Sequence, residues 1–199
     1  MHDNRSRALG ALYGLALGDA LGMPTQSLPR AEIVARYGAV ISGFHPGADG
    51  HPLAAGLPAG SVTDDTEQAV LLARLVVAGG GEVDAAALAR GLLAWEESMR
   101  ARGSLDLLGP STRQALAALA AGTDIAQAGR RGVTNGAAMR VAPVGIATSS
   151  RDPRLLEDRV VAASRLTHNT GVALAGAAAV AMAVSAGIDG DPLLSLIHI

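Results

Sequence analysis

The feature that most constrains the fold is a polar segment that runs directly into an apolar one. Residues 60–68 read Gly-Ser-Val-Thr-Asp-Asp-Thr-Glu-Gln, and residues 69–78 contain one charged side chain, Arg74. A helix that is apolar on nearly every side is usually buried. The pattern therefore predicts a central core helix with two adjacent carboxylates, Asp64 and Asp65, where it begins.

Two interpretations of this acidic helix start are open from the sequence. Asp64 as the N-cap, followed three residues later by Glu67, is a variant of the capping box, and the helix dipole favours acidic residues in the first turn. Hard cations such as Mg²⁺ also prefer oxygen ligands. Consecutive helical residues point about 100° apart, but side chains and backbone can converge where a loop enters the first turn.

Composition restricts the class of protein. A chain of 199 residues with 49% hydrophobic and 17% charged residues can form one domain with a substantial core. The absence of cysteine excludes disulfides, thiolate catalysis and cysteine-bound zinc. A net charge of -2 argues against a nucleic-acid or membrane-surface partner, and 2% aromatic residues provide few stacking platforms for single strands.

The longest apolar stretch, residues 171–188, is long enough to resemble a membrane span. It consists mostly of Ala, Gly and Val, which allow close helix packing, and no Trp, Tyr or basic anchors flank it. Residues 1–7 lack the apolar run of a signal peptide. We therefore expect a soluble core helix in a cytoplasmic monomer.

Helical periodicity extends along most of the chain, and no segment has a convincing strand pattern. The all-α reading expects helices over residues 6–21, 29–37, 84–102, 110–121, 124–130, 153–166 and 172–186. In the helix over 84–102, capped by Asp84, one stripe of large apolar side chains reads as core: Leu88, Leu92, Trp95 and Met99. Gly10, Gly14 and Gly18 share one face of the first helix, which would let another helix approach closely.

The long segment over residues 38–60 is rich in Gly and Pro and reads as a loop. A loop of this length inside a compact domain is uncommon and often functional. Its two histidines, His45 and His51, have a spacing that matches no metal template, so we expect both on the surface.

Three further polar positions each have a structural and a functional interpretation. Asp19 is a lone carboxylate in an apolar stretch, for which a cap or a structural hydrogen bond is favoured. The Thr-Asn-Gly turn at 134–136 feeds a segment of small residues and could bind an anion at a helix N-terminus, although Asn-Gly is also a common turn. Pro143 should kink or shorten that helix. His168 lies in a short polar segment between two apolar helices, and it could be either a structural residue or part of a functional site.

Four separate segments together resemble one family. Gly-Asp-Ala-Leu-Gly at 18–22, Thr-Asp-Asp-Thr at 63–66, Asn-Gly-Ala-Ala-Met-Arg at 135–140 and Thr-His at 167–168 occur in an order and spacing similar to the ADP-ribosylglycohydrolases. The resemblance covers the chain to about residue 187. It implies a compact, multi-helix, all-α domain with a binuclear Mg²⁺ centre. It also implies hydrolysis of the glycosidic bond that joins ADP-ribose to a protein side chain or small acceptor.

The same resemblance implies roles for individual residues. Thr63, Asp64 and Asp65 would bind metal, with Asp65 also in the catalytic set. The substrate pocket would contain four further residues, namely Asn135, Gly136, Met139 and His168. Many family members have Glu at the position of Gln26, and an amide cannot accept a proton as a general base. Asp106 is then the candidate base, unless a metal-bound hydroxide suffices or the chain only binds ADP-ribose.

A second departure from the family pattern concerns the C-terminal part. The family carries another acidic metal motif there, and this chain stops before any such motif. We expect a single domain over 1–194, incomplete at its C-terminus, with 195–199 as a non-native tail. On this hypothesis the chain binds Mg²⁺ weakly and is poorly active. A non-catalytic ADP-ribose binder and a structural member of the family are the alternatives.

Overall fold

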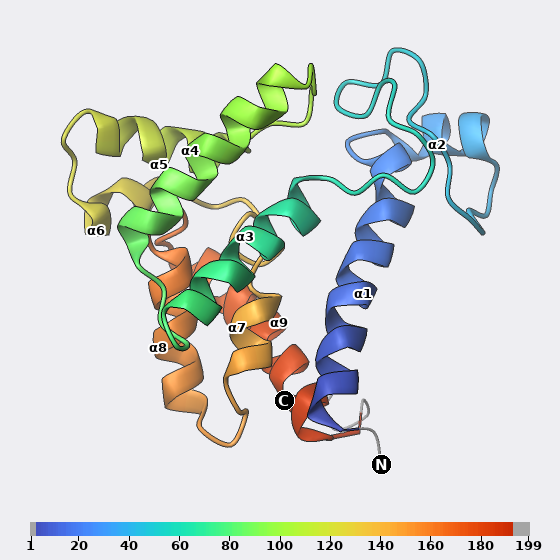
Figure 1. Cartoon of the computed structure of the whole chain (residues 1–199). Helices are drawn as coiled ribbons and strands as arrows, with labels where there is room; N and C mark the ends of the chain where they lie inside the picture. The colour runs from blue at the N-terminus through green and yellow to red at the C-terminus, as the bar shows by residue number, and fades with distance from the viewer. Residues whose placement is uncertain (1–2, 193–199) are drawn as a thin grey trace.

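The computed structural model describes residues 3–192, and within this range every regular element is helical (Figure 1), which confirms the all-α prediction. Two short 3₁₀ turns, Met23–Thr25 and Gly129–Arg131, accompany the α-helices. The α-helices are α1 (Asn4–Gly22), α2 (Arg30–Tyr37), α3 (Asp64–Ala78), α4 (Ala85–Ala101), α5 (Pro110–Ala120), α6 (Ile125–Ala128), α7 (Ala142–Ala147), α8 (Pro153–Ser164) and α9 (Gly171–Asp189). The predicted tail at 195–199 lies outside the described residues.

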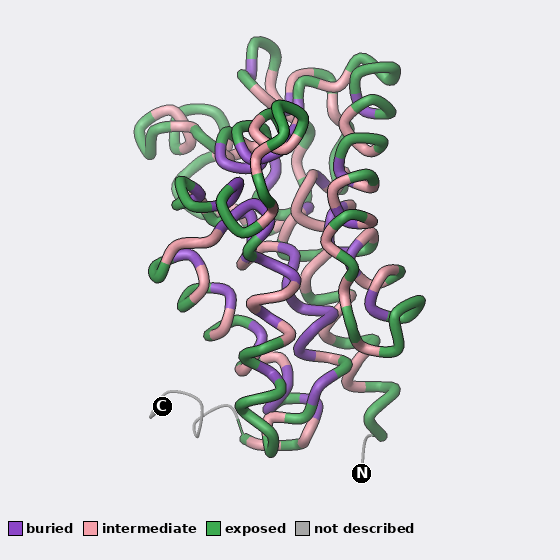
Figure 2. Tube along the Cα trace, turned by 90° about the vertical axis from the view of Figure 1, so that its left-hand side faces the viewer, coloured by how far each residue is buried: buried purple, intermediate pink, exposed green. Residues whose placement is uncertain are grey.

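Helix α3 lies at the centre and packs against α1, α4 and α7. Its inner face contributes Leu72 to the main core, and the stripe predicted on α4 is largely buried there as well. The prediction that α3 is buried on all sides is wrong, because Val70 and Val77 are 41% and 81% exposed. Figure 2 shows the buried positions running through the middle of the molecule. The central helix therefore has one core face and one solvent face.

The C-terminal helix α9 packs on α7, α8 and α1. Small residues allow the close approach to α7, since a Cβ at Gly145 would overlap the Ala181 carbonyl oxygen. Within residues 3–192, α9 is the one helix long and apolar enough to cross a membrane by length and composition. A third of the most apolar stretch of α9 is buried inside the molecule, and Val172 near its start is 70% exposed.

The glycine face of α1 does not receive another helix. A Cβ at Gly10, Gly14 or Gly18 would have no atom within 4 Å, so the predicted close approach is wrong. Gly14 and Gly18 instead border a hollow that also contains the carboxylate of Asp19. The glycines thus keep this side of α1 open next to the acidic residues.

The segment between α2 and α3 is a loop, as predicted, but the expectation for His51 is wrong. His51 is 1% exposed, and its Nδ1 accepts hydrogen bonds from the backbone N–H groups of Leu53 (3.1 Å) and Ala54 (2.8 Å). The ring therefore organises a turn inside the loop. A turn of this kind has no sequence signal beyond Gly and Pro content, so spacing alone could not place His51 in the interior.

Candidate active site

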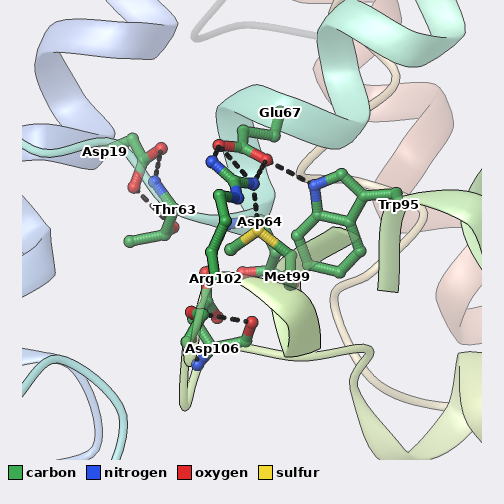
Figure 3. A network of polar contacts seen from close by, with 9 residues as sticks. Asp19, Thr63, Asp64, Glu67, Trp95, Met99, Arg102 and Asp106 are labelled. Carbon is green, nitrogen blue, oxygen red and sulfur yellow. Dashed lines mark hydrogen bonds and ion pairs between the residues drawn. The ribbon is translucent and has the colours of Figure 1, made fainter. Parts of the chain in front are cut away.

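The acidic start of α3 is capped differently from the sequence prediction. The N-cap residue is Thr63 and the helix begins at Asp64, so the capping box between Asp64 and Glu67 is wrong. The Glu67 carboxylate turns outward, accepts a hydrogen bond from Trp95 Nε1 (2.5 Å) and pairs with Arg102 (3.1 Å), as Figure 3 shows. Glu67 therefore joins α3 to α4 rather than closing the helix end.

The cap of α3 comes from another helix. Asp19, near the end of α1, accepts hydrogen bonds from the backbone N–H groups of Thr63 (2.8 Å) and Thr66 (3.2 Å). It also accepts from their hydroxyls, at 2.6 Å for Thr63 and 2.5 Å for Thr66, and Figure 3 shows the contact with Thr63. The structural interpretation of Asp19 is therefore confirmed. One carboxylate satisfies free N–H groups of the first turn and fixes the position of α1 against α3.

Replacing Asp19 by Ala should lower the free energy of unfolding by about 2–4 kcal/mol, because it removes a helix cap and leaves partly buried donors without an acceptor. Urea denaturation measures the change. The control is Asp84→Ala, which removes an exposed N-cap from α4 and should cost clearly less than Asp19→Ala. Equal losses in the two variants would contradict the tertiary role of Asp19.

Three carboxylates repel one another around the start of α3. Asp106 is 4% exposed, and its Oδ2 accepts a hydrogen bond from the backbone N–H of Asp64 (2.8 Å). Burial first, and then the nearby charges of Asp106 and Asp65, raise the pKa of Asp64 to about 8. Burial raises the pKa of Asp106 to about 6, and burial also raises the pKa of Asp65. A proton or a bound cation would relieve this accumulation of negative charge.

The oxygen atoms at this helix start fit part of the shell of a hard cation. Thr63 Oγ1 lies 2.6 Å from Asp19 Oδ1 and 3.4 Å from Asp65 Oδ2, and its single hydroxyl proton can serve only one of these two carboxylates at a time. Carboxylate and hydroxyl oxygens suit Mg²⁺, which usually retains several waters. Within residues 3–192 no three Asp, Glu or His side chains are arranged to hold one ion. Thr63, Asp64 and Asp65 would thus supply only part of a coordination shell.

A cavity of about 400 Å³ opens beside these carboxylates, within the size range of small-molecule pockets. Its wall contains six of the residues singled out from the sequence: Gln26, Asp64, Asp106, Asn135, Gly136 and Met139. Thr63 and Asp65 border an adjoining hollow, which Gln26 also lines. The fold therefore brings four distant segments of the chain to one place.

The Asn-Gly loop does not form the predicted cradle at a helix N-terminus. Residues 135–140 are turns, closed by a hydrogen bond from the Met139 N–H to the Asn135 carbonyl (3.0 Å), and α7 begins only at Ala142. Pro143 lies in the first turn of α7 and starts this helix rather than kinking one. Asn135 and Gly136 thus reach the cavity as a turn.

His168 lies behind the cavity wall. Its side chain is fully buried, with Nε2 at 2.9 Å from Thr134 Oγ1 and Nδ1 at 2.8 Å from Thr167 Oγ1. Burial, and then the charge of Arg140, lowers the pKa of His168 to about 4. The imidazole is therefore neutral at pH 7, and any effect on a ligand passes through the residues in front of it.

Gly136 leaves the space that the imidazole occupies. A Cβ at this position would lie 2.8 Å from Cε1 and 3.1 Å from Nε2 of His168. We expect Gly136→Ala to shift the turn and lower the free energy of unfolding by about 1–3 kcal/mol, measured by urea denaturation. The control is Gly176→Ala in α9, where a Cβ has no neighbour within 4 Å. It should be neutral, or stabilising by up to about 1 kcal/mol.

The sequence interpretation missed the buried polar residues that connect the two sides of the site. Arg140 is 1% exposed and contacts Gln68 and Thr167, and Thr134 lines the cavity. Arg140 is the one charged residue in the otherwise apolar segment 136–147, which could have indicated a buried arginine. A lone charge in such a segment is buried only when partners satisfy it.

The structure thus places an oxygen-rich acidic cluster beside a cavity in an all-helical domain. A family model described as ADP-ribosylglycohydrolase matches residues 1–198. The chain belongs to the ADP-ribosylglycohydrolase family, as the resemblance of its four segments predicted.

Several relatives support this assignment. The chain is 40% identical over 185 residues to the uncharacterized protein YegU of Escherichia coli (strain K12), covering 93% of this chain and 55% of the relative. It is 37% identical over 177 residues to an uncharacterized protein of Archaeoglobus fulgidus, covering 89% and 54%. It is 35% identical over 169 residues to ADP-ribosyl-[dinitrogen reductase] glycohydrolase of Rhodospirillum rubrum, covering 85% and 52%. The chain thus spans about half the length of these relatives.

Proposed function

We propose that this protein takes part in Mg²⁺-dependent hydrolysis of the glycosidic bond between ADP-ribose and a protein side chain or small acceptor. The observation that carries the proposal is the meeting of Asp64 and Asp106 with the Asn135–Gly136 turn around one cavity. Family membership supports the chemistry, as does the printed name of the relative from Rhodospirillum rubrum.

The residues divide into a metal side and a base side. Thr63, Asp64 and Asp65 would hold Mg²⁺, which when bound would orient ribose hydroxyls and neutralise the carboxylates. Asp106 would take a proton from the attacking water, since a carboxyl group with a pKa of about 6 is suited to general-base catalysis near neutral pH. The remaining negative charge would favour the oxocarbenium-like transition state at the anomeric carbon. Gln26 borders the same cavity and could bind a hydroxyl but not remove a proton.

We propose an ADP-ribosylated protein or small molecule as the partner, without a nucleic-acid or membrane partner. We also propose a cytoplasmic monomer whose single domain extends over residues 1–194. The packing of α9 against three other helices favours a soluble protein.

The experiment that tests the function is a calorimetric titration with ADP-ribose, with and without Mg²⁺ up to millimolar concentration. We expect Mg²⁺-dependent binding that Asp65→Asn weakens at least about tenfold, since it removes a charged oxygen ligand. The control, Asp84→Asn, changes an exposed cap of α4 and should bind as the wild type does. Absence of ADP-ribose binding would overturn the proposal.

A second candidate is an ADP-ribose-binding protein without turnover. The resemblance to the family favours it, because Gln26 stands where many members have Glu and an amide cannot accept a proton as a base. Binding of ADP-ribose without release of ADP-ribose from any modified acceptor would support this candidate.

A further inference from the structure

A buried chain of hydrogen bonds joins the acidic cluster to the opposite wall of the cavity through Arg140. Its Nη1 donates to Gln68 Oε1 (3.3 Å), and its Nη2 donates to Thr167 Oγ1 (2.6 Å). Arg140, Gln68 and Thr167 are each at most 1% exposed. Within residues 3–192 the hydrogen bonds of Arg140 go to an amide and a hydroxyl rather than to a carboxylate, although the nearby charge of Asp64 favours the charged guanidinium and partly offsets the lowering of the Arg140 pKa by burial.

On the side of Arg140 toward α3, the guanidinium orients an amide. A guanidinium can only donate, so the oxygen of Gln68 must face Arg140. The Gln68 Nε2 then faces Asp64 Oδ2 at 3.4 Å and donates toward it. The carboxylate therefore faces a donor rather than a second acceptor.

On the opposite side, the guanidinium orients a hydroxyl. Thr167 Oγ1 accepts from Arg140, so its single proton must go either to Nδ1 of His168 (2.8 Å) or to the Ser164 carbonyl (3.5 Å). That carbonyl already accepts from the N–H groups of Thr167 (3.1 Å) and His168 (2.9 Å), which uses both lone pairs. The Thr167 proton therefore goes to Nδ1.

The direction of the bond from Thr167 to His168 decides whether Thr134, in the cavity wall, can donate a hydrogen bond to a ligand. A neutral imidazole that accepts at Nδ1 carries its proton on Nε2, and Nε2 lies 2.9 Å from Thr134 Oγ1. The Thr134 oxygen is then an acceptor toward His168, so its own proton is free for another partner. Thr134 lines the cavity, so an acceptor oxygen bound there could receive this proton.

We propose that Arg140 is a positioning residue that makes Gln68 a donor to Asp64 and, through Thr167 and His168, makes Thr134 a donor to an acceptor oxygen of the bound ligand. The inference rests on the proposed function for the identity of that ligand, ADP-ribose. It assigns substrate contact to Thr134, and an indirect role to His168.

The first test reads the imidazole directly. Nitrogen-15 spectra of the histidine rings distinguish the two neutral tautomers, and the signal absent from His168→Gln identifies His168 among the five histidines. We expect the Nε2–H form in the wild type at neutral pH. In Thr167→Val the donor to Nδ1 is lost, and a mixture of both tautomers should appear. A wild-type ring protonated on Nδ1 would overturn the inference.

The second test measures ADP-ribose binding by calorimetry. Thr134→Val should weaken binding about tenfold, the loss of one hydrogen bond, and Thr134→Ser should restore it. Thr167→Val should weaken binding similarly, and the double variant should lose little more, because both changes break one chain. Arg140→Lys keeps the charge but has one nitrogen for two partners, so it should also weaken binding.

A matched control is available in Thr148→Val. Thr148 is also buried and also accepts a hydrogen bond from an arginine, Arg159 Nη1 at 3.1 Å, but it does not line the cavity. This variant should leave the His168 tautomer and ADP-ribose affinity unchanged. Wild-type affinity in Thr134→Val would overturn the ligand contact. If the wild type has the Nε2–H form of His168 but binds no ADP-ribose, the proposed function and the ligand contact of Thr134 are both overturned. The direction of the hydrogen bonds from Thr167 through His168 to Thr134 would still stand.

Discussion

Replacing Asp106 by Asn should lower the hydrolysis of an ADP-ribosylated substrate about 10²- to 10⁴-fold, while affinity for ADP-ribose changes only severalfold. Asp106 borders the cavity, is nearly fully buried and has a pKa raised to about 6. The amide keeps an oxygen that can accept the backbone N–H of Asp64, so the start of α3 should remain in place. What the amide cannot do is take up a proton.

The measurement is the release of ADP-ribose under single-turnover conditions, with binding followed separately by calorimetry. Gln26→Glu is the discriminating partner variant, because Gln26 borders the same cavity and glutamate could accept the proton instead. If Asp106 is the base, Gln26→Glu alone should change the rate little and should partly rescue Asp106→Asn. Unchanged hydrolysis in Asp106→Asn, or a large gain in Gln26→Glu alone, would assign the proton transfer to another group.

The helices could be predicted from the sequence because their apolar spacing and their caps are local. Asp84 caps α4 by accepting from the N–H groups of Ala86 and Ala87, as its position before an apolar run indicated. The cap of α3 could not be predicted in this way. Its acceptor, Asp19, is more than forty residues away in the chain, and this tertiary contact displaced the local capping box of Asp64 and Glu67.

The identity of several site residues could be predicted from the sequence, but the direction of their hydrogen bonds could not. The resemblance singled out Asp64, Asn135 and Gly136, and the structure brings them to one cavity. Periodicity alone gave no reason for them to meet. Chemistry that depends on direction, such as the donor role of Thr134 behind His168, requires distances and competing partners, which no spacing rule contains. The open glycine face of α1 is a similar case, since spacing shows that a helix could approach there but not that one does.

The metal-free protein should lose stability as the pH rises from 6.5 to 8. In the unfolded chain the carboxyl group of Asp64 has its ordinary pKa of 3.8, and in the folded chain the pKa is about 8. Between these values the folded state keeps a proton that the unfolded chain has released, so the free energy of unfolding falls with increasing pH. His168 acts in the opposite direction, but only between its folded pKa of about 4 and its ordinary 6.5.

The window from pH 6.5 to 8 lies above the Asp106 pKa of about 6, and the raised pKa of Asp65 acts in the same direction as that of Asp64, so the Asp64→Asn control separates the share of Asp64. At about 1.4 kcal/mol for each pH unit, the expected loss is about 2 kcal/mol in EDTA, measured by urea denaturation. Mg²⁺ should reverse the trend, because it competes with the proton for the same carboxylate and binds the ionised form, so the stabilisation by Mg²⁺ should grow with pH. Asp64→Asn is the control and should show neither the loss in EDTA nor the gain with Mg²⁺. A wild-type protein with constant stability across this window in EDTA would mean that Asp64 is already ionised at pH 6.5. The acidic cluster would then not need a cation to relieve its charge.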